Sequence, residues 1–440
     1  MLVYPDRTCQ KSRTTRVGWY DDVRLDVSLD GSTKEDIRPS NGLRTSPYTF
    51  ELKGKPNAAI ILDRTLLTVK LQIVDGRGQP VARKAAGEGG GGAALAVVGS
   101  PISSLWQRIE TRINDKLVNV GSARNVAHKG LIEDWLVHRL DHRAMRRGLH
   151  SKQAAGVDPM CEEYEDDSFY DGNVVQFCGR PPIDLLVVNN LLSPRCEVAF
   201  TFYPNPADFV ILNAEEEGYQ VKIKDLVMHI DRAEVAAESL PRLPQMGQDT
   251  EEVYCGRYGS VRDYQLPKGT LRWKQHVMSE EDGPLPKYVL AGLVPACAFG
   301  GAAKNRRDPL HFGHFKLNHL QLQVGGKFYP SSPYSPLRAP NGSHGGMREY
   351  YALFEELGIV RPFISPKHHA QGATLYPFNL TPDMRSIFST ALLPPRYGPL
   401  SAELGFSEPL PETVVLLLYL VYDQTIKVLG AHALPAEAQF

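Results

Sequence analysis

The feature that most constrains the fold of this chain is an order of predicted elements that occurs twice. A hairpin pattern covers 109–118 in the first half and another covers 320–329 in the second. Lys116 and Lys327, which follow the two turns, are 211 residues apart. The predicted turn residues are Asn114 and Asp115 in the first hairpin and Gly325 and Gly326 in the second. A short helix is predicted after each hairpin.

The apolar spacing places these helices at 126–140 and at 347–357, where Gly358 ends the second one. A second sequence match follows in each half. The segment that begins at Glu197 resembles the segment that begins at Glu403, at an offset of 206 residues. An apolar run comes after both segments, at 209–212 and at 414–417. Two matches in the same order indicate two tandem all-β domains. The alternative is that the matches arise only because β-rich sequences resemble one another in general.

Runs rich in β-branched residues and Leu predict further strands. They cover 59–74, 183–192, 195–203, 219–235, 400–406 and 413–428. Short strands with long loops are typical of sandwiches, and eight strands per half would make jelly rolls. The predicted fold class is therefore all-β: two tandem eight-stranded jelly rolls (a double jelly roll) with short helices in the loops. The predicted boundaries are an extended N-terminal arm at 1–40, a first jelly roll at 41–235, a linker at 236–250, a second jelly roll at 251–430 and a tail at 431–440.

The charge balance excludes one class of protein. Lys and Arg number 49 against 50 Asp and Glu, so a globally basic coat for nucleic acid is excluded, although a local basic patch is not. Six Cys without a Cys-x-x-Cys pair are typical of reduced thiols inside a cell. The first residues lack an apolar signal core, and the apolar run 414–422 is about half a membrane span. We expect a soluble chain.

The candidate metal ligands do not converge in sequence. On one extended strand, His311 and His319 would share a face about 26 Å apart with His314 on the other face, which cannot close a coordination shell. His368-His369 lie in a Pro-flanked segment that we interpret as a solvated loop. The acidic run 162–167 lacks the spacing of a calcium loop. We expect no metal and no cofactor.

The sequence nominates no catalytic group either. It contains no Gly-x-Ser-x-Gly, His-Glu-x-x-His or P-loop pattern, and Gly87–Gly92 is interpreted as a flexible loop tip. No nucleophile has a base placed beside it by a motif. The expectation is a protein that is not an enzyme.

Several segments carry a resemblance to a known family. They are 98–118, 219–228, 286–294, 311–324, 376–383 and 400–414. The most specific is Phe378-Asn-Leu-Thr-Pro-Asp383, which precedes the last strand pair. On these segments the chain resembles the hexon-type major capsid proteins of Polinton/Maverick elements and adintoviruses. Two features depart from the family pattern: the last strand is apolar on both faces, and the Arg-rich first 40 residues have no counterpart.

The resemblance implies a structural role in a virion. The implied unit is a homotrimeric capsomer of pseudo-hexagonal outline, with six jelly rolls from three chains, which tiles an icosahedral shell around double-stranded DNA. The implied partners are neighbouring capsomers and a minor capsid or penton protein, with assembly in the host cytoplasm or nucleus. The N-terminal arm carries Arg7, Lys11, Arg13 and Arg16. We interpret it either as an inner arm that contacts packaged DNA or a minor capsid protein, or as an ordinary charged tail.

Two alternatives stay open at this point. The chain could be a minor, accessory or domesticated capsid-like protein with the same fold. It could also be a cellular carbohydrate-binding β-sandwich protein or an enzyme on that fold, which would need exposed aromatic or acidic residues gathered on one loop face. The four Trp are scattered along the sequence instead, at Trp19, Trp106, Trp135 and Trp273.

Overall fold

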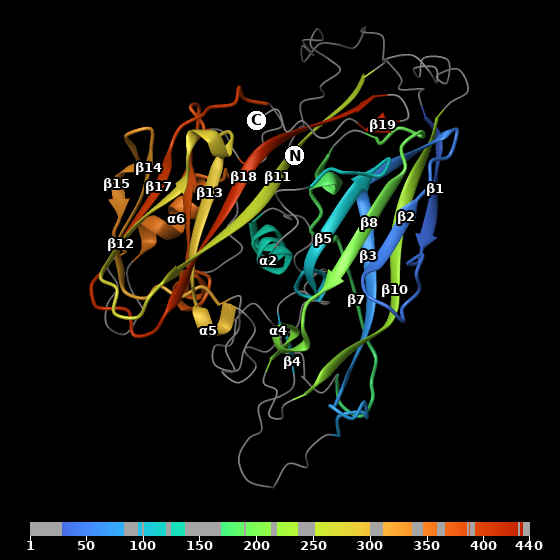
Figure 1. Ribbon diagram of the computed structural model, residues 1–440, viewed down its shortest axis with the longest axis horizontal. Helices are drawn as coiled ribbons and strands as arrows, with labels where there is room; N and C mark the ends of the chain where they lie inside the picture. The colour runs from blue at the N-terminus through green and yellow to red at the C-terminus, as the bar shows by residue number, and fades with distance from the viewer. Residues whose placement is uncertain are drawn as a thin grey trace, which may run out of the picture.

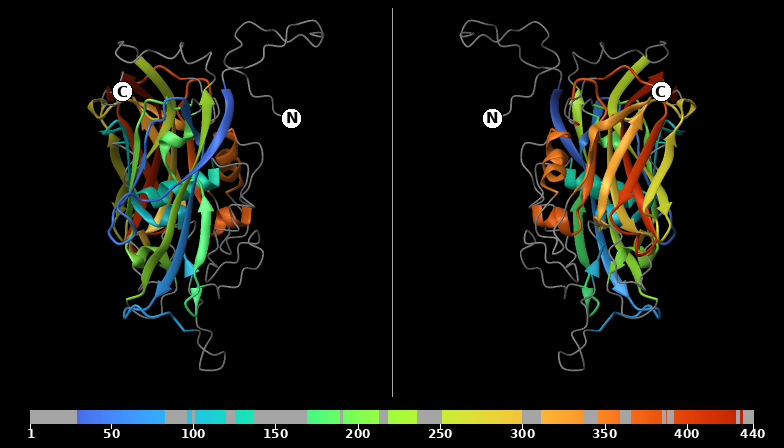
Figure 2. Two further views of the ribbon diagram at one scale, coloured as in Figure 1. Left: turned by 90° about the vertical axis from the view of Figure 1, so that its right-hand side faces the viewer. Right: turned by 90° about the vertical axis from the view of Figure 1, so that its left-hand side faces the viewer.

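Two β-sandwiches lie side by side in this computed structural model, with helix α2 (Val126–Leu136) between them (Figure 1). Their long strands run in roughly the same direction, and helices α6 (Met347–Glu355) and α7 (Pro366–Gln371) of the second half lie to one side of them (Figure 2). The structure describes residues 29–82, 96–98, 101–119, 125–136, 169–188, 191–212, 218–235, 251–299, 311–336, 346–358, 366–384, 387, 392–429 and 432–433.

Each sandwich consists of two antiparallel sheets. In the first half the sheets are β1-β10-β3-β7 and β2-β8-β5-β6. Their strands are β1 (Leu29–Ile37), β2 (Tyr48–Leu52), β3 (Ala58–Val74), β5 (Trp106–Ile113), β6 (Lys116–Leu117), β7 (Val175–Gly179), β8 (Val198–Pro204) and β10 (Gln220–Val235). A small extra pair joins β4 (Ala96–Val97) to β9 (Ile211–Leu212).

The second half repeats this plan with the sheets β11-β18-β13-β16 and β12-β17-β14-β15. Its strands are β11 (Glu251–Leu266), β12 (Arg272–Met278), β13 (Tyr288–Pro295), β14 (Leu317–Val324), β15 (Lys327–Tyr334), β16 (Leu375–Asn379), β17 (Leu400–Phe406) and β18 (Val414–Leu429), and β19 (His432–Ala433) pairs with β18. In both halves the first sheet joins the first, eighth, third and sixth strands, and the second sheet joins the second, seventh, fourth and fifth. The prediction of two eight-stranded jelly rolls is confirmed.

Short helices occupy the connections, as the sequence predicts. They are α1 (Pro101–Ser104), α2, η2 (Asp184–Val187), α4 (Ala207–Val210), η4 (Glu280–Asp282), α5 (Ala296–Phe299), α6 (Met347–Glu355) and α7 (Pro366–Gln371). Helices α2 and α6 follow the β5–β6 and β14–β15 hairpins at equivalent places. Gly358, just past α6, has φ +66°, which suits a glycine that ends a helix.

The two hairpins turn where the sequence predicts. All four turn residues have positive φ, 46° and 65° at Asn114 and Asp115 and 52° and 84° at Gly325 and Gly326. Tight two-residue hairpins need this backbone conformation, which Asn, Asp and Gly adopt most readily. The 211-residue offset therefore relates true structural equivalents.

The second predicted match is displaced by four residues. Ile113 pairs with Val198, and its equivalent Val324 pairs with Leu400, so the correct offset on these strands is 202. Thr201, and not Glu197, is the counterpart of Glu403. The apolar run 209–212 is also not a counterpart of 414–417, because it forms the end of α4 and β9, whereas the equivalent of β18 is β10.

Two other boundaries differ from the prediction. The first sheet starts at Leu29, inside the range predicted as an arm, and β1 pairs with β10 along its length. Its sequence has no apolar alternation because it is an edge strand, and charged edge strands resist pairing with other chains. The predicted strand 183–192 is wrong: its first turn is the 3-10 helix η2, which buries Leu185 and Leu186. A short apolar run fits a strand and a buried irregular segment equally well.

The buried side chains form three apolar clusters. One fills the first sandwich and another fills the second. The third lies on the outer face of the β11-β18-β13-β16 sheet and includes Val98 and Ile132 from the first half. We call this third cluster the seam, because it joins the two jelly rolls.

Candidate functional site at the seam between the jelly rolls

Strand β18 shows how the seam is built. Leu416, Leu418 and Leu420 point into the second sandwich, whereas Leu417 and Tyr419 point into the seam. Successive side chains of a strand alternate between faces, so a strand buried on both faces reads as an unbroken apolar run. The predicted departure of this strand from an alternating pattern is thereby explained: both of its faces are covered within one chain.

The cover on the seam side comes from both halves. Helix α6 of the second half contributes Tyr350, Leu353 and Phe354, and the first half contributes Val98 and Ile132. Arg348 and Tyr351 of α6 face water, Tyr351 with 61% exposure, whereas Glu349 of the same helix is buried. The seam is therefore a third hydrophobic core, which the second half supplies for the most part and which Val98 and Ile132 of the first half help to close.

Farther along, β11 and β18 extend into the first jelly roll itself. Tyr254, Ile426 and Val428 belong to the apolar cluster of the first sandwich. The Gln424 amide donates a hydrogen bond to the Val118 carbonyl at 2.9 Å. The two halves thus share core residues as well as a common boundary.

Three ionisable side chains are buried at the edge of the seam. Lys129 and Glu133 lie one turn apart on α2, and Asp184 begins η2. The Lys129 ammonium lies 2.6 Å from Asp184 Oδ1 and 3.9 Å from Glu133 Oε1. Lys129 is 1% exposed, Asp184 6% and Glu133 8%. Buried charges are stable only when they are paired and hydrogen-bonded, so these residues form one ionic cluster.

The second half completes this cluster. The Tyr419 hydroxyl of β18 donates to Glu133 Oε1 at 2.8 Å, and the Gly259 amide of β11 donates to Asp184 Oδ1 at 3.1 Å. Glycine is required at position 259 because a Cβ there would overlap the Tyr419 ring. The polar part of the seam therefore links first-half acids to second-half donors.

The electrostatics of the cluster follow from its burial. Burial raises the pKa of the Glu133 carboxyl; the Lys129 ammonium opposes this shift, and the Asp184 carboxylate adds to it. Burial and the neighbouring Glu133 raise the pKa of Tyr419 well above its ordinary value of 10.0. Tyr419 thus remains a neutral hydrogen-bond donor throughout the range in which proteins are stable.

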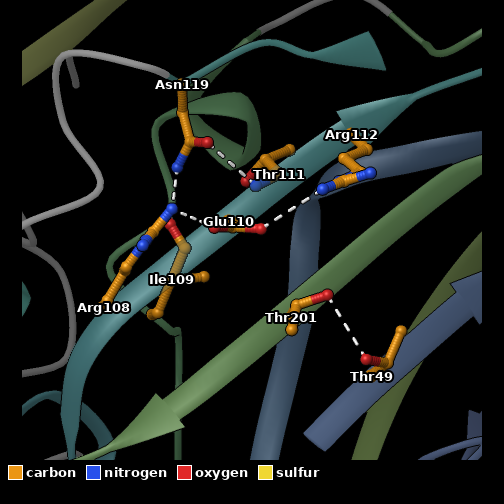
Figure 3. Close-up of polar contacts among 8 residues, drawn as sticks. All are labelled: Thr49, Arg108, Ile109, Glu110, Thr111, Arg112, Asn119 and Thr201. Atoms are coloured by element: carbon orange, nitrogen blue, oxygen red, sulfur yellow. Dashed lines mark hydrogen bonds and ion pairs between the residues drawn. The ribbon is translucent and has the colours of Figure 1, made fainter. Parts of the chain in front are cut away.

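A different polar cluster lies on the outer face of the β2-β8-β5-β6 sheet (Figure 3). Glu110 of β5 is 6% exposed and lies between Arg108, which it contacts directly, and Arg112, whose guanidinium is 3.6 Å away. Asn119 fastens the strand by accepting from the Thr111 amide at 2.9 Å and donating to the Ile109 carbonyl at 2.7 Å.

The equivalent position in the second half is Gln321, which is 7% exposed. Its amide donates to the Pro330 carbonyl at 2.8 Å. At this equivalent position both jelly rolls therefore bury a polar side chain, a carboxylate between two arginines in the first and a neutral amide in the second.

The outer face of β1-β10-β3-β7 is charged and cross-linked from strand to strand. Asp225 lies 2.5 Å from Arg38, which directly follows β1, and 3.2 Å from Lys70 of β3. His229 lies 2.6 Å from Asp36 and 2.8 Å from the Thr68 hydroxyl. Partial burial raises the pKa of Asp225, but hydrogen bonds from Lys70 and Arg38 lower it by more. The pKa of Asp225 is therefore below its ordinary value. This face is suited to contact with water or with another polar surface.

The predicted arm residues Arg7, Lys11, Arg13 and Arg16 lie outside the described residues, as does the acidic run 162–167. Within the described ranges no group of three or more His, Cys, Asp or Glu is placed to hold a metal ion. No helix of the described part is long and apolar enough to cross a membrane.

The histidine predictions need two corrections. Strand β14 starts only at Leu317, after Phe315 and Lys316 turn the chain with positive φ, so His311 and His319 are not on one continuous strand. His369 is not in a solvated loop: it lies on α7, is 1% exposed, and contacts the Tyr350 ring edge-on.

The Phe-Asn-Leu-Thr-Pro-Asp segment has a structural role beside the seam. Asn379 Oδ1 accepts from the Thr381 amide at 3.0 Å and from its hydroxyl at 2.6 Å. The Asn379 amide donates to the Glu356 carbonyl at 3.0 Å, at the end of α6. The segment therefore ends β16 and holds α6 against the sheet.

Sequence reasoning missed the ionic cluster. Lys129 and Glu133 have the i, i+4 spacing of an ordinary exposed helix pair, which gives no indication of burial. The available signal was Asp184, a single acid inside an apolar run after Pro181 and Pro182. An acid in that position needs a buried cation, and the predicted helix was the nearest source of one.

Comparison with known proteins finds matches among solved structures, which identify the fold of the chain. No protein-family model and no curated protein sequence matches the chain. Among solved structures, it is similar to the PBCV-1 virus capsid, with a TM-score of 0.59 and 11% identity over 95% of this chain and 99% of that one. It is similar to the Sputnik virophage structure, with a TM-score of 0.62 and 10% identity over 100% and 94%. It is also similar to the mavirus major capsid protein, with a TM-score of 0.53 and 10% identity over 98% and 94%. The shared fold is the double jelly roll.

Proposed function

We propose that this chain is a major capsid protein, a structural protein of a virion. The observation that carries the proposal is a double jelly roll that matches viral capsid proteins over nearly the whole length of both partners. The internal repeat supports it, because each half has the same strand order and the two halves are fixed side by side.

The proposed assembly is a homotrimer with six jelly rolls in a pseudo-hexagonal outline. Three copies of two fused sandwiches give a closed ring, and such a block tiles a hexagonal lattice. The seam supports this geometry, since a shared core keeps the two jelly rolls of one copy at a fixed spacing. Neighbouring capsomers and a minor capsid or penton protein would complete an icosahedral shell around double-stranded DNA, assembled in the host cytoplasm or nucleus.

The solution mass of the purified chain, measured by light scattering with negative-stain images of the same peak, tests this function. The expected result is a particle near three times 48.9 kDa with a hexagonal outline. A stable monomer at micromolar concentration would contradict the proposal. Abundance in purified particles separates a major capsid protein from a minor or accessory one.

For the arm we propose a contact of Arg7, Lys11, Arg13 and Arg16 with packaged DNA or with a minor capsid protein at the inner side of the shell. The deletion that tests this contact removes residues 1–28, because Leu29 begins β1. Trimers should persist while closed shells become fewer. Normal numbers of closed particles from the truncated chain would overturn this part of the proposal.

A further inference from the structure

We propose that the buried carboxyl group of Glu133 is a proton-controlled latch between the two jelly rolls. The proposal concerns the cohesion of a single chain, so it does not rest on the proposed capsid function. It is carried by the position of Glu133 on α2 of the first half, where it meets Tyr419 on β18 of the second.

The groups that face Glu133 come from four elements. Its own helix supplies Lys129 at 3.9 Å, and β18 supplies the Tyr419 hydroxyl at 2.8 Å. Asp184 of η2 and Arg257 of β11 act on it through their charges. The Arg257 guanidinium donates to the Ile387 carbonyl at 3.2 Å.

The charges of the cluster leave room for one proton on Glu133. Lys129 lies 2.6 Å from Asp184 and 3.9 Å from Glu133, so its ammonium is committed mainly to Asp184. Asp184 Oδ2 is buried and has no hydrogen-bond partner among the described residues, so Asp184 depends on the Lys129 ammonium to balance its charge. A second carboxylate would put like charges together in a buried space, which a proton on Glu133 avoids.

The direction of the pH effect follows. Burial raises the pKa of Glu133, Lys129 lowers it and Asp184 raises it. The pKa of Glu133 therefore lies above its ordinary value of 4.5. The folded chain therefore binds this proton more tightly than the unfolded chain does. The stabilisation is fully present below about pH 4.5 and is lost as the pH rises through the raised pKa. Above it, the ionised carboxylate draws water into the seam or loosens the contact between the halves.

The first test compares the full chain with its Glu133→Gln variant. Glutamine keeps an oxygen for the Tyr419 hydroxyl but cannot ionise. From pH 4.5 to pH 9, the melting temperature of the wild type should fall relative to the variant, by up to about 2 °C per pH unit where Glu133 titrates. Difference infrared spectroscopy should show a protonated carboxyl band that the variant lacks. Parallel melting curves without that band would overturn the proposal.

Two further variants test the latch even if Glu133→Gln fails to fold. Asp184→Asn removes a like charge, so the pH dependence should move to lower pH. Tyr419→Phe removes a hydrogen bond that favours the ionised form, so the dependence should move to higher pH. Equal shifts, or none, would contradict the mechanism. Asp225→Asn is the control, because the lowered pKa of Asp225 keeps it ionised across this range and the profile should not change.

Discussion

The sheets β1-β10-β3-β7 and β11-β18-β13-β16 are equivalent and have the same strand order. Their outer faces differ in chemistry, because the first is charged and the second is apolar. In the first, cross-strand ion pairs such as Asp225 with Arg38 and Lys70 cover the face, and Arg38 is 68% exposed. In the second, the outer face carries Leu417 and Tyr419, which are 0% and 2% exposed.

This difference shows that strand order alone does not determine what a sheet presents to its surroundings. An antiparallel sheet with one face in a sandwich is free to make its other face polar, whereas a sheet covered on both faces has to be apolar on both. The outer face of this sheet is buried in the seam in the second half, whereas its equivalent in the first half lies at the surface.

The largest effect is expected when a charge is placed in the seam. Leu417→Lys would bury an ammonium among apolar side chains and should lower the free energy of unfolding by more than about 4 kcal/mol in urea titrations. Leu66→Lys, on the half-exposed outer face of β3, is the matched control and should cost less than about 1 kcal/mol. Equal losses would mean that the two faces do not differ as described.

The next effect concerns ion pairs. Lys129→Met leaves Asp184 buried without its cation and should cost about 3–5 kcal/mol. Lys70→Met removes an exposed partner of Asp225, because Lys70 is 40% exposed, and should cost about 0–1 kcal/mol. Chemical denaturation of both variants checks the contrast, which fails if Lys129→Met proves as mild as Lys70→Met.

A smaller effect is expected from added bulk. Gly259→Ala on β11 would push a methyl group into the Tyr419 ring and should cost about 1–3 kcal/mol. Gly31→Ala on the equivalent strand β1 meets nothing nearer than Glu234 Oε2 at 3.7 Å and should cost far less. Thermal melting distinguishes them, and an unchanged Gly259→Ala melting temperature would show that the seam is looser than these contacts require.

The smallest effects are expected on the outer faces of the other two sheets. Glu110→Gln leaves Arg108 and Arg112 half-exposed to water and should cost less than about 1 kcal/mol. Gln321→Glu replaces the amide that donates to Pro330 and should cost about 1–2 kcal/mol. If Glu110→Gln were the costlier change, the arginines would depend on their carboxylate more than their exposure indicates.

Much of the fold was accessible from sequence because its signals are local. Asn114-Asp115 and Gly325-Gly326 determine the hairpin turns by their own backbone preferences, so the 211-residue repeat could be found without tertiary information. The apolar run of β18 likewise signalled a strand covered on both faces, although it did not say by what.

The rest depends on contacts between distant segments. Strand β1 has little strand propensity of its own and is held by pairing with β10, where Glu35 accepts from Arg232 at 2.7 Å. Asp184–Val187 form η2 instead of a strand, and Asp184 there contacts Lys129 and Gly259, which are far away in sequence. The ionic cluster could not be predicted for the same reason: its members look ordinary until the two jelly rolls come together.

Hydroxyl-radical footprinting of the folded chain, read residue by residue with mass spectrometry, tests the contrast between the two faces most directly. Leu417 and Tyr419 should be protected, whereas Leu66 and His229 on the first sheet and Tyr351 on α6 should be modified. Modification of Tyr419 at the rate of Tyr351 would contradict the account, because it would place the outer face of the second sheet in water.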